Sequence, residues 1–304
     1  MILQQLADGL ILGSIIALGA IGLTLTYAIL RFANFAHGEF LTFGAYLALL
    51  ALGQFQALST ATFGPLSFGW PLLASLAVAI LATAGLALLL DRLLFARLGR
   101  AGVAIAVGMG SFGAALALRN LLFFAFGGEP QYYSRAIQIA LPLLPRSVLG
   151  GVRVTPDQLA VLGITALLVI AMHLFLSRAT LGRAMRAVAH NPQLATVTGI
   201  DVAAVVRWTW IIGAGLAAVA GVFAGLTVQI RPTMGLDLLL PLFAAVILGG
   251  IGSPLGAVLG GLIVGIAESL AVPLVGAEYR AAVAFLLLIL ILLVRPTGLF
   301  GERG

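Results

Sequence analysis

Residues 238–267 read LLLPLFAAVILGGIGSPLGAVLGGLIVGIA, thirty consecutive positions without Asp, Glu, Lys or Arg. A single helix of this length would measure about 45 Å, which is more than the roughly 30 Å hydrocarbon core of a bilayer requires. A break at membrane depth is tolerated only where protein or water surrounds it. We therefore expect two membrane segments, 239–251 and 254–272, that turn back near the inner side, with one tilted helix as the alternative. The break is assigned to three glycines and a proline: Gly249, Gly250, Gly252 and Pro254.

The rest of the chain has the same character. Of its 304 residues 62% are hydrophobic and only 9% are charged, against roughly 45–50% apolar residues in soluble domains. The composition predicts an all-α, polytopic membrane helix bundle of eight or nine segments, forming one transmembrane domain over residues 1–304. The other expected spans are 9–30, two within 40–90, 101–126, 156–177, 208–230 and 280–295.

Arginine residues orient the chain, which has no lysine. Short cytoplasmic loops collect basic residues, so segments 91–102 and 178–207 are expected inside. With nine segments the N-terminus lies outside and the last span ends inside, at Arg295 and Arg303. The loop 127–157 then lies outside although it carries Arg135, Arg146 and Arg153.

The inner segment 178–207 predicts two short helices that meet at an angle. Residues 182–190 suit a helix, Asn191 is a favoured N-cap, Pro192 is tolerated at the first helical position, and Gly199 suits a C-terminal stop. A passive connector would explain such a loop, but two capped helices also suit a docking element for another protein.

Four motifs in order give the chain a specific resemblance. They are NFAHGEF at 34–40, GRAMRAVAHNPQLATVTGI at 182–200, VILGGIGSPLGAVLGGLIVGIAESL at 246–270 and RPTGLFG at 295–301. The chain resembles the LivH-like permease subunits of branched-chain amino acid ABC importers, over nearly its whole length. Its least similar part is the outer loop 127–155.

The resemblance implies a type II ABC importer-like transmembrane domain in the bacterial cytoplasmic (inner) membrane. The implied partners are a second permease subunit, either related or identical, two ATP-binding subunits and an extracytoplasmic solute-binding protein, together with membrane lipid and without nucleic acid. The solute would be a branched-chain or other hydrophobic or neutral amino acid, or a small solute such as urea, an amide or an aromatic acid. The loop 178–207 would carry the coupling helix that docks on the ATPase, through Arg183, Arg186, Ala187, Asn191, Pro192, Ala195 and Gly199.

The sequence independently indicates that the motor is elsewhere. A Walker A loop needs a lysine at the phosphates, and the chain has none. We expect this chain to bind no cofactor or metal of its own, with ATP and Mg²⁺ on the partner subunits. An enzyme is disfavoured because the chain has no HExxH motif and its three histidines are widely separated. An ion-coupled secondary transporter or a channel is the stronger rival.

Polar residues within the spans are candidates for the substrate pathway, since burying charge in lipid is costly. Asn34, His37 and Glu39 cluster at the start of the second span, where they line the solute path, hold a broken helix that lines it, or are solvated at the inner interface. Glu268 follows thirty uncharged residues. Its role is either in gating or in a structural hydrogen bond to a helix end. Arg119 is expected near the outer surface, where extension of its side chain toward water is favoured over contact with a substrate carboxylate.

Overall fold

The computed structural model describes residues 2–59, 61–99, 104–134, 138–144, 151–295 and 297–301. Four arginines used in the orientation argument lie outside the described residues: Arg100, Arg135, Arg146 and Arg303.

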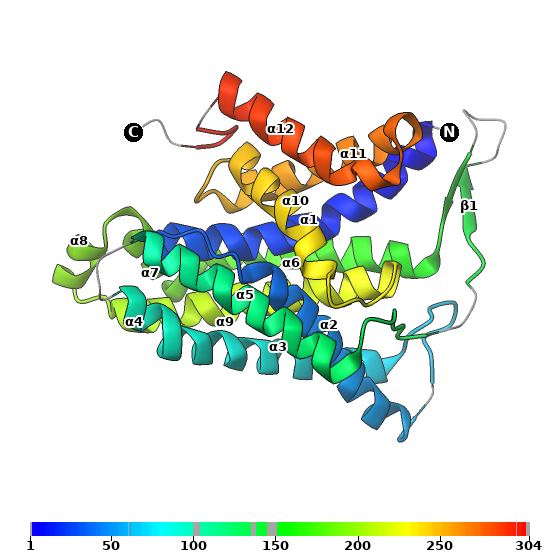
Figure 1. The fold of residues 1–304 in the computed structure, drawn as a ribbon, viewed down its shortest axis with the longest axis horizontal. Coiled ribbons are helices and arrows are strands. Elements are labelled where there is room, and N and C mark those ends of the chain that lie inside the picture. Colours follow the sequence, from blue (N-terminus) through cyan, green and yellow to red (C-terminus); the bar gives the residue numbers. More distant parts are fainter. Residues whose placement is uncertain are drawn as a thin grey trace.

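Nine long helices make up most of this described chain (Figure 1). Eight of them are long and apolar enough to cross a membrane when α3 is counted with its continuation to Gly99 and α12 with the turn that precedes it from Ala277. The ninth, α10, is an apolar helix of 16 residues. This confirms the expected helix bundle of eight or nine segments with an interrupted glycine-rich pair. The nine are α1 (Ile2–Leu30), α2 (His37–Gln56), α3 (Trp70–Leu90), α5 (Ala104–Phe126), α6 (Pro156–Arg178), α9 (Val202–Thr227), α10 (Met234–Gly249), α11 (Pro254–Val275) and α12 (Arg280–Val294).

The shorter elements gather at the two ends of the bundle (Figure 1). One end holds α7 (Thr180–His190), α8 (Pro192–Val197) and α4 (Ala96–Gly99), which continues α3 through a π-helical turn at Asp91–Phe95. The other holds the start of α1 and the hairpin of β1 (Leu141–Leu144) and β2 (Val152–Val154); a 3₁₀ turn, Ala277–Tyr279, precedes α12. We call the α7 end the inner end, following the arginine pattern.

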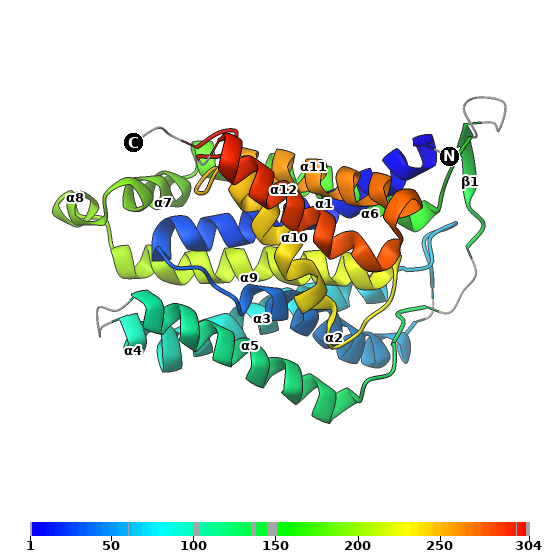
Figure 2. The ribbon, with the colours of Figure 1, turned by 45° about the horizontal axis from the view of Figure 1, so that its top comes forward.

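Helices α1 and α9 form the centre of the bundle. In an apolar stretch of 18 residues in α1, 89% of the residues are buried inside the protein. In the corresponding stretch that ends with α12, only 6% are buried. Figure 2 shows α12, α10 and α5 across one face of the molecule. In α9, 78% of the residues in the corresponding stretch are buried. Because protein encloses most of α1 and α9, their side chains contribute little to any lipid contact.

Close helix packing accounts for the small residues of the centre. A Cβ added to Gly13 of α1 would lie 2.8 Å from the Cα of Leu262 on α11, and one added to Gly261 would lie 2.7 Å from the Cα of Ala17. Real Cβ atoms do not approach so closely, so these positions require glycine. Such faces let helices in lipid pack backbone to backbone.

The outer loop is tied to the bundle at several points. Gln131 and Ile230 exchange backbone hydrogen bonds of 2.9 and 2.8 Å, and the hydroxyl of Tyr133 donates to the carbonyl of Ala45 at 2.8 Å. Burial raises the pKa of the Tyr133 phenol well above its usual value. The described start of this loop, residues 127–134, is therefore held against the bundle.

Candidate translocation site and coupling loop

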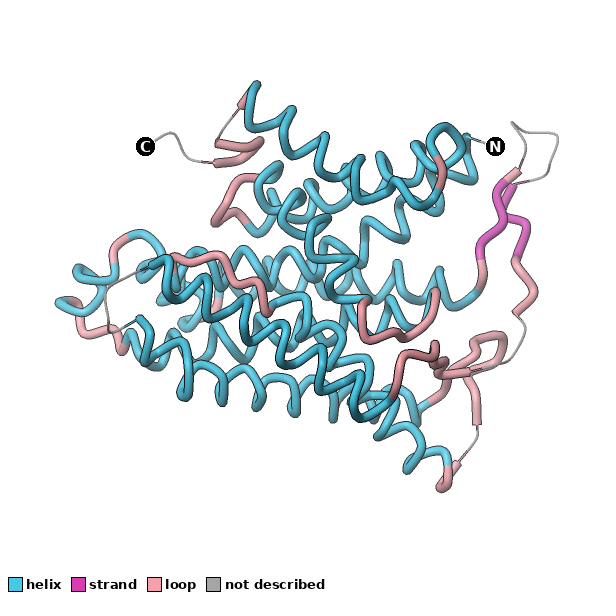
Figure 3. The backbone as a smooth tube through the Cα atoms, in the orientation of Figure 1, coloured by secondary structure: helices cyan, strands magenta, loops and turns pink. Residues whose placement is uncertain are grey.

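Helix α2 begins deep inside the bundle. His37, its first residue, places Nε2 2.9 Å from the carbonyl oxygen of Gly19. Gly19 lies eleven residues before the inner end of α1, a distance of about 16 Å along the helix. A carbonyl can only accept, so Nε2 of His37 carries the proton and donates. The chain between the two helices therefore runs back from the inner end toward mid-depth, as the tube of Figure 3 shows.

A serine on α5 satisfies the irregular backbone of this returning segment. The amide of Phe35 donates to Oγ of Ser111 at 3.1 Å, and that hydroxyl lies 3.3 Å from the carbonyl of Ala33. Oδ1 of Asn34 accepts from the amide of Ala36 at 3.1 Å. Backbone groups without partners are costly at membrane depth, so Ser111 and Asn34 stabilise a break that the bilayer alone would not tolerate. Nothing in the sequence pattern singles out Ser111, which lies 76 residues from Phe35 along the chain.

Helix α10 also begins at this depth, against α2. A Cβ on Gly38 would overlap the backbone of Gly235, and the reverse holds for Gly235. The amide of Gly235 donates to the Thr42 hydroxyl at 3.0 Å. We call the meeting point of the two helix starts, residues 34–42 and 234–237, the central junction. Both helix N-termini, with their partial positive charge, lie there.

Glu39 is neutralised by Arg119, contrary to the expectation that this arginine reaches the outer surface. Nη2 and Nε of Arg119 lie 2.6 and 3.0 Å from Oε1 of Glu39, and the two side chains are 14% and 2% exposed. The expectation was wrong because the helix α2 that carries Glu39 begins deeper than the sequence indicated. A buried pair removes the need for Arg119 to extend toward water.

An ion pair at the central junction faces out of the chain. Nη2 of Arg231 lies 3.4 Å from Oδ2 of Asp237, and the side chains are 44% and 53% exposed. Asp237 lies twelve residues before the end of α10 at Gly249, about 18 Å from the inner end. Neither residue is among the sequence candidates, because residues 231–238 are expected to connect two spans rather than to form a break at membrane depth.

The four predicted pathway residues do not lie together. Asn34, His37 and Glu39 lie at the central junction and are buried, at 0%, 0% and 1% exposure, so within the chain they are not solvated. Glu268 is also buried, but it lies toward the outer end of α11, next to Ser269, whose hydroxyl donates to Gln5 of α1 at 3.1 Å. Glu268 Oε1 has no hydrogen-bond partner among the described residues.

The loop after α6 forms the two predicted short helices. Asn191 caps α8 by accepting from the amide of Leu194 at 2.9 Å, and Pro192 takes the first position. Gly199 has φ +85°, and the amide of Ile200 donates to the carbonyl of Ala195 at 3.0 Å. These are the contacts of a helix that ends in a left-handed residue.

Helix α8 projects from the bundle (Figure 1). It exposes apolar side chains. Leu194 is 60% exposed and Val197 is 85% exposed, while Ala195 is buried against the chain. On α7, Arg183 and Arg186 are exposed and Ala187 is half-buried.

The break between α10 and α11 lies at the inner end. Gly250 and Gly252 have φ of +100° and +89°, which favours glycine at both positions. Ser253 caps α11 by accepting from the amide of Gly256 at 3.1 Å, and Pro254 takes the first helical position. The C-terminal segment covers the end of α10, because the amide of Phe300 donates to the carbonyl of Gly249 at 3.0 Å.

Comparison with known proteins gives consistent matches over nearly the whole chain. Residues 5–292 match the family described as "Branched-chain amino acid transport system / permease component". The high-affinity branched-chain amino acid transport system permease protein BraD of Pseudomonas aeruginosa is 37% identical, over 99% of this chain and 96% of that protein. LivH of Escherichia coli K12, a permease protein of the same description, is 35% identical over the same shares.

A solved structure shares the fold. A chain of "PsaBC from Streptococcus pneumoniae in complex with Fab" superposes with a TM-score of 0.50, covering 98% of this chain and 93% of that chain. At 15% identity the likeness concerns the fold alone.

Proposed function

This chain belongs to the permease component family of branched-chain amino acid transport systems, and from that membership we propose that it is one permease subunit of an ATP-driven importer. Its solute is a branched-chain amino acid or another hydrophobic or neutral amino acid. The alternative solutes are urea, amides and aromatic acids. The partners are a second permease subunit, two ATP-binding subunits and an extracytoplasmic solute-binding protein.

The chain is a permease subunit rather than an enzyme, and it is a multi-pass protein of the cytoplasmic (inner) membrane. Its transmembrane domain is of the type II ABC importer-like class. Without a lysine it cannot form a Walker A loop, so ATP hydrolysis takes place on separate subunits.

The main support for a solute path along this surface is the exposed ion pair of Arg231 and Asp237. Charged groups at mid-depth almost always face the bundle interior or a water-filled cavity, because exposure to lipid is costly. Both side chains are about half exposed in the single chain. The surface around them is therefore covered by a water-filled path, a second permease subunit, or both.

The chemistry of this surface suits a small zwitterion. Arg231 matches a carboxylate and Asp237 matches an ammonium group, and the starts of α2 and α10 add partial positive charge. Phe35 and Phe243, whose ring centroids lie 5.5 Å apart, add apolar surface near the junction. Buried Asn34, His37 and Glu39 hold the junction in shape and line the path only if it opens.

Helix α8 supports the ATP-driven part of the proposal. It is a short, capped helix that presents Leu194 and Val197 away from the bundle. Exposed apolar side chains at the end of a bundle, next to the arginines of α7, suit docking into a groove of another protein. We assign the coupling role to Arg183, Arg186, Ala187, Asn191, Pro192, Ala195 and Gly199.

Cysteine accessibility tests the pathway. In this naturally cysteine-free chain, Leu236→Cys places a thiol beside Asp237, and Leu81→Cys places one at a similar depth on α3; the two leucines are 44% and 74% exposed. In membranes that hold the assembled transporter, a small water-soluble thiol reagent should modify residue 236 and leave residue 81 unmodified, although residue 81 is the more exposed in the chain. Equal protection of both residues would show that no water-filled path reaches the α10 surface and would remove the pathway from it.

A further inference from the structure

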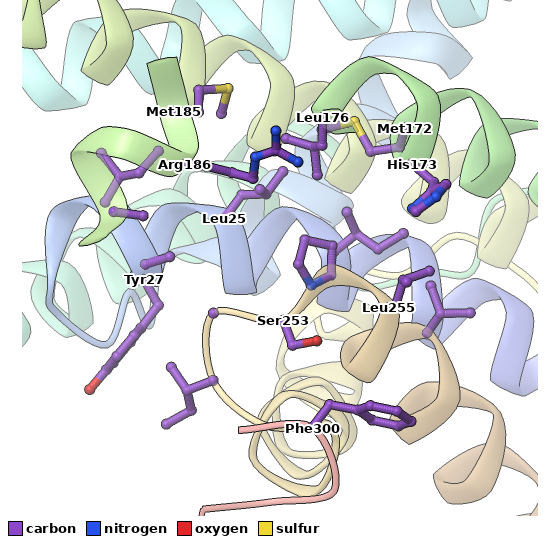
Figure 4. A pocket seen from close by; sticks show the side chains of 18 of the residues that line it. Leu25, Tyr27, Met172, His173, Leu176, Met185, Arg186, Ser253, Leu255 and Phe300 are labelled. Atoms are coloured by element: carbon purple, nitrogen blue, oxygen red, sulfur yellow. The ribbon is translucent and has the colours of Figure 1, made fainter. Parts of the chain in front are cut away.

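A cavity of about 520 Å³ lies at the inner end, apart from the central junction. Its walls come from the ends of α1 and α6, from α7, and from the turn between α10 and α11 (Figure 4). The volume falls in the range of small-ligand pockets, roughly 300–1,000 Å³.

Positive charge converges on this cavity. Arg31 and Arg186 line it, and so do Ser253 and Pro254, which form the N-terminus of the 22-residue helix α11. Figure 4 shows Arg186 of α7 and Ser253 on opposite sides of the cavity. Nη2 of Arg31 donates to the carbonyl of Ala189, and this contact fixes its direction.

No negative charge balances these groups. Within the described part of the chain, no aspartate or glutamate lines the cavity. The remaining polar groups of the wall are Tyr27, His173, Ser177 and His190, all of which can form hydrogen bonds to an anion. Two guanidinium groups and a helix N-terminus favour an anion, above all a phosphate.

One wall of the cavity is apolar and follows the membrane-spanning helices. It consists of side chains from α1, α6 and α11: Ile21, Leu25, Val169, Met172, Leu176, Leu255 and Val258. Such a wall offers no favourable contact to a free anion, whereas an acyl chain can pack against it. The charged mouth lies where the headgroups of the inner leaflet would be.

We propose that this cavity binds an anionic phospholipid of the inner leaflet, with the phosphate between Arg31, Arg186 and the start of α11 and an acyl chain along the apolar wall. The proposal requires that the chain spans the membrane with this end inside, and it does not depend on the transported solute. Because α7 leads directly into α8, the bound lipid would hold the coupling loop against α1 and α11.

Two matched arginine variants test the site. Arg186→Gln removes a lining cation, and Arg183→Gln removes an exposed arginine one turn earlier on α7 that does not line the cavity. Affinity of the full-length chain for phosphatidylglycerol and phosphatidylcholine is measured by native mass spectrometry. Each variant loses one inner-surface charge, so general attraction to anionic lipid should fall about fivefold in both. Only Arg186→Gln should lose roughly a further tenfold, because it also loses a charged hydrogen bond.

Two further measurements distinguish a phospholipid site from a site for a free anion. Leu255→Trp, at a half-exposed position, fills the apolar wall without changing charge and should also weaken phosphatidylglycerol binding. Equal losses in the two arginine variants, or no preference over phosphatidylcholine, would overturn the site. If millimolar inorganic phosphate displaced the lipid from wild type but not from Arg186→Gln, the cavity would be a free-anion site and the phospholipid assignment would be wrong.

Discussion

Glu39 and Arg119 form a buried ion pair at the central junction. Removing one partner of a buried ion pair costs about 3–5 kcal/mol, whereas replacing both by apolar residues is often neutral. We expect Arg119→Leu to lower the thermal midpoint of the detergent-solubilised chain markedly. The double variant Glu39→Leu with Arg119→Leu should recover most of the loss.

Intrinsic fluorescence during a thermal ramp measures both variants. Arg153→Leu, an exposed arginine at the outer end, serves as the control and should leave the midpoint nearly unchanged. If the single and double variants had the same thermal midpoint, the pair would have no coupling energy. Arg119 would then not stabilise the fold by neutralising Glu39.

Single residues were the least predictable part of the site. Asn34, His37 and Glu39 could be selected from the sequence as candidates because polar groups in an apolar chain are conspicuous. Their partners were not: Ser111 and Arg119 come from α5, far away in the sequence. Asp237 was missed because a charge next to an apolar run usually marks the end of a span, whereas here it marks a helix that starts at mid-depth.

At the scale of elements, the coupling helix α8 depends on its two ends. Loss of an N-cap costs about 1 kcal/mol, and a β-branched residue is strained at the left-handed Gly199. We expect Asn191→Leu and Gly199→Val to abolish stimulation of ATP hydrolysis by solute-loaded binding protein in the reconstituted transporter, with membrane insertion intact.

Gln193→Ala is the control for these variants, because Gln193 is exposed on the same helix and makes neither cap contact. Normal stimulated transport in both cap variants would remove the coupling role from α8. Loss of insertion would instead point to a folding defect.

Most helices could be predicted from the spacing of charges, and their starts could not. The break at 250–253 follows from Gly250 and Gly252, whose left-handed backbone angles few other residues adopt, and from Pro254, which suits the first position of the next helix. The beginnings of α2 and α10 depend on tertiary contacts, since Thr42 and the Gly38 backbone meet Gly235 only in the fold. Similarly, α9 begins at Val202 rather than at 208, because Asp201 caps it by accepting from the amide of Ala204 at 3.0 Å.

For the whole molecule, the arginine pattern and the two ends of the bundle predict the orientation. Single cysteines at Ile2 and Ile139 should be labelled from outside by an impermeant reagent. Cysteines at Arg97 and His190 should be labelled only after the membrane is opened. External labelling at residue 97 or 190 would invert the orientation, and with it the inner-leaflet lipid site.

Transport by purified components in proteoliposomes tests whether this chain is one subunit of an ATP-driven importer. The chain alone should accumulate no radiolabelled leucine with ATP or with a proton or sodium gradient. With a second permease subunit, the ATP-binding subunits and the binding protein, uptake should appear and should vanish when ATP is withheld. If the chain alone accumulated leucine in response to an ion gradient, it would be a secondary transporter rather than a subunit of an ATP-driven importer. If it only let leucine flow down its own concentration gradient, it would be a channel.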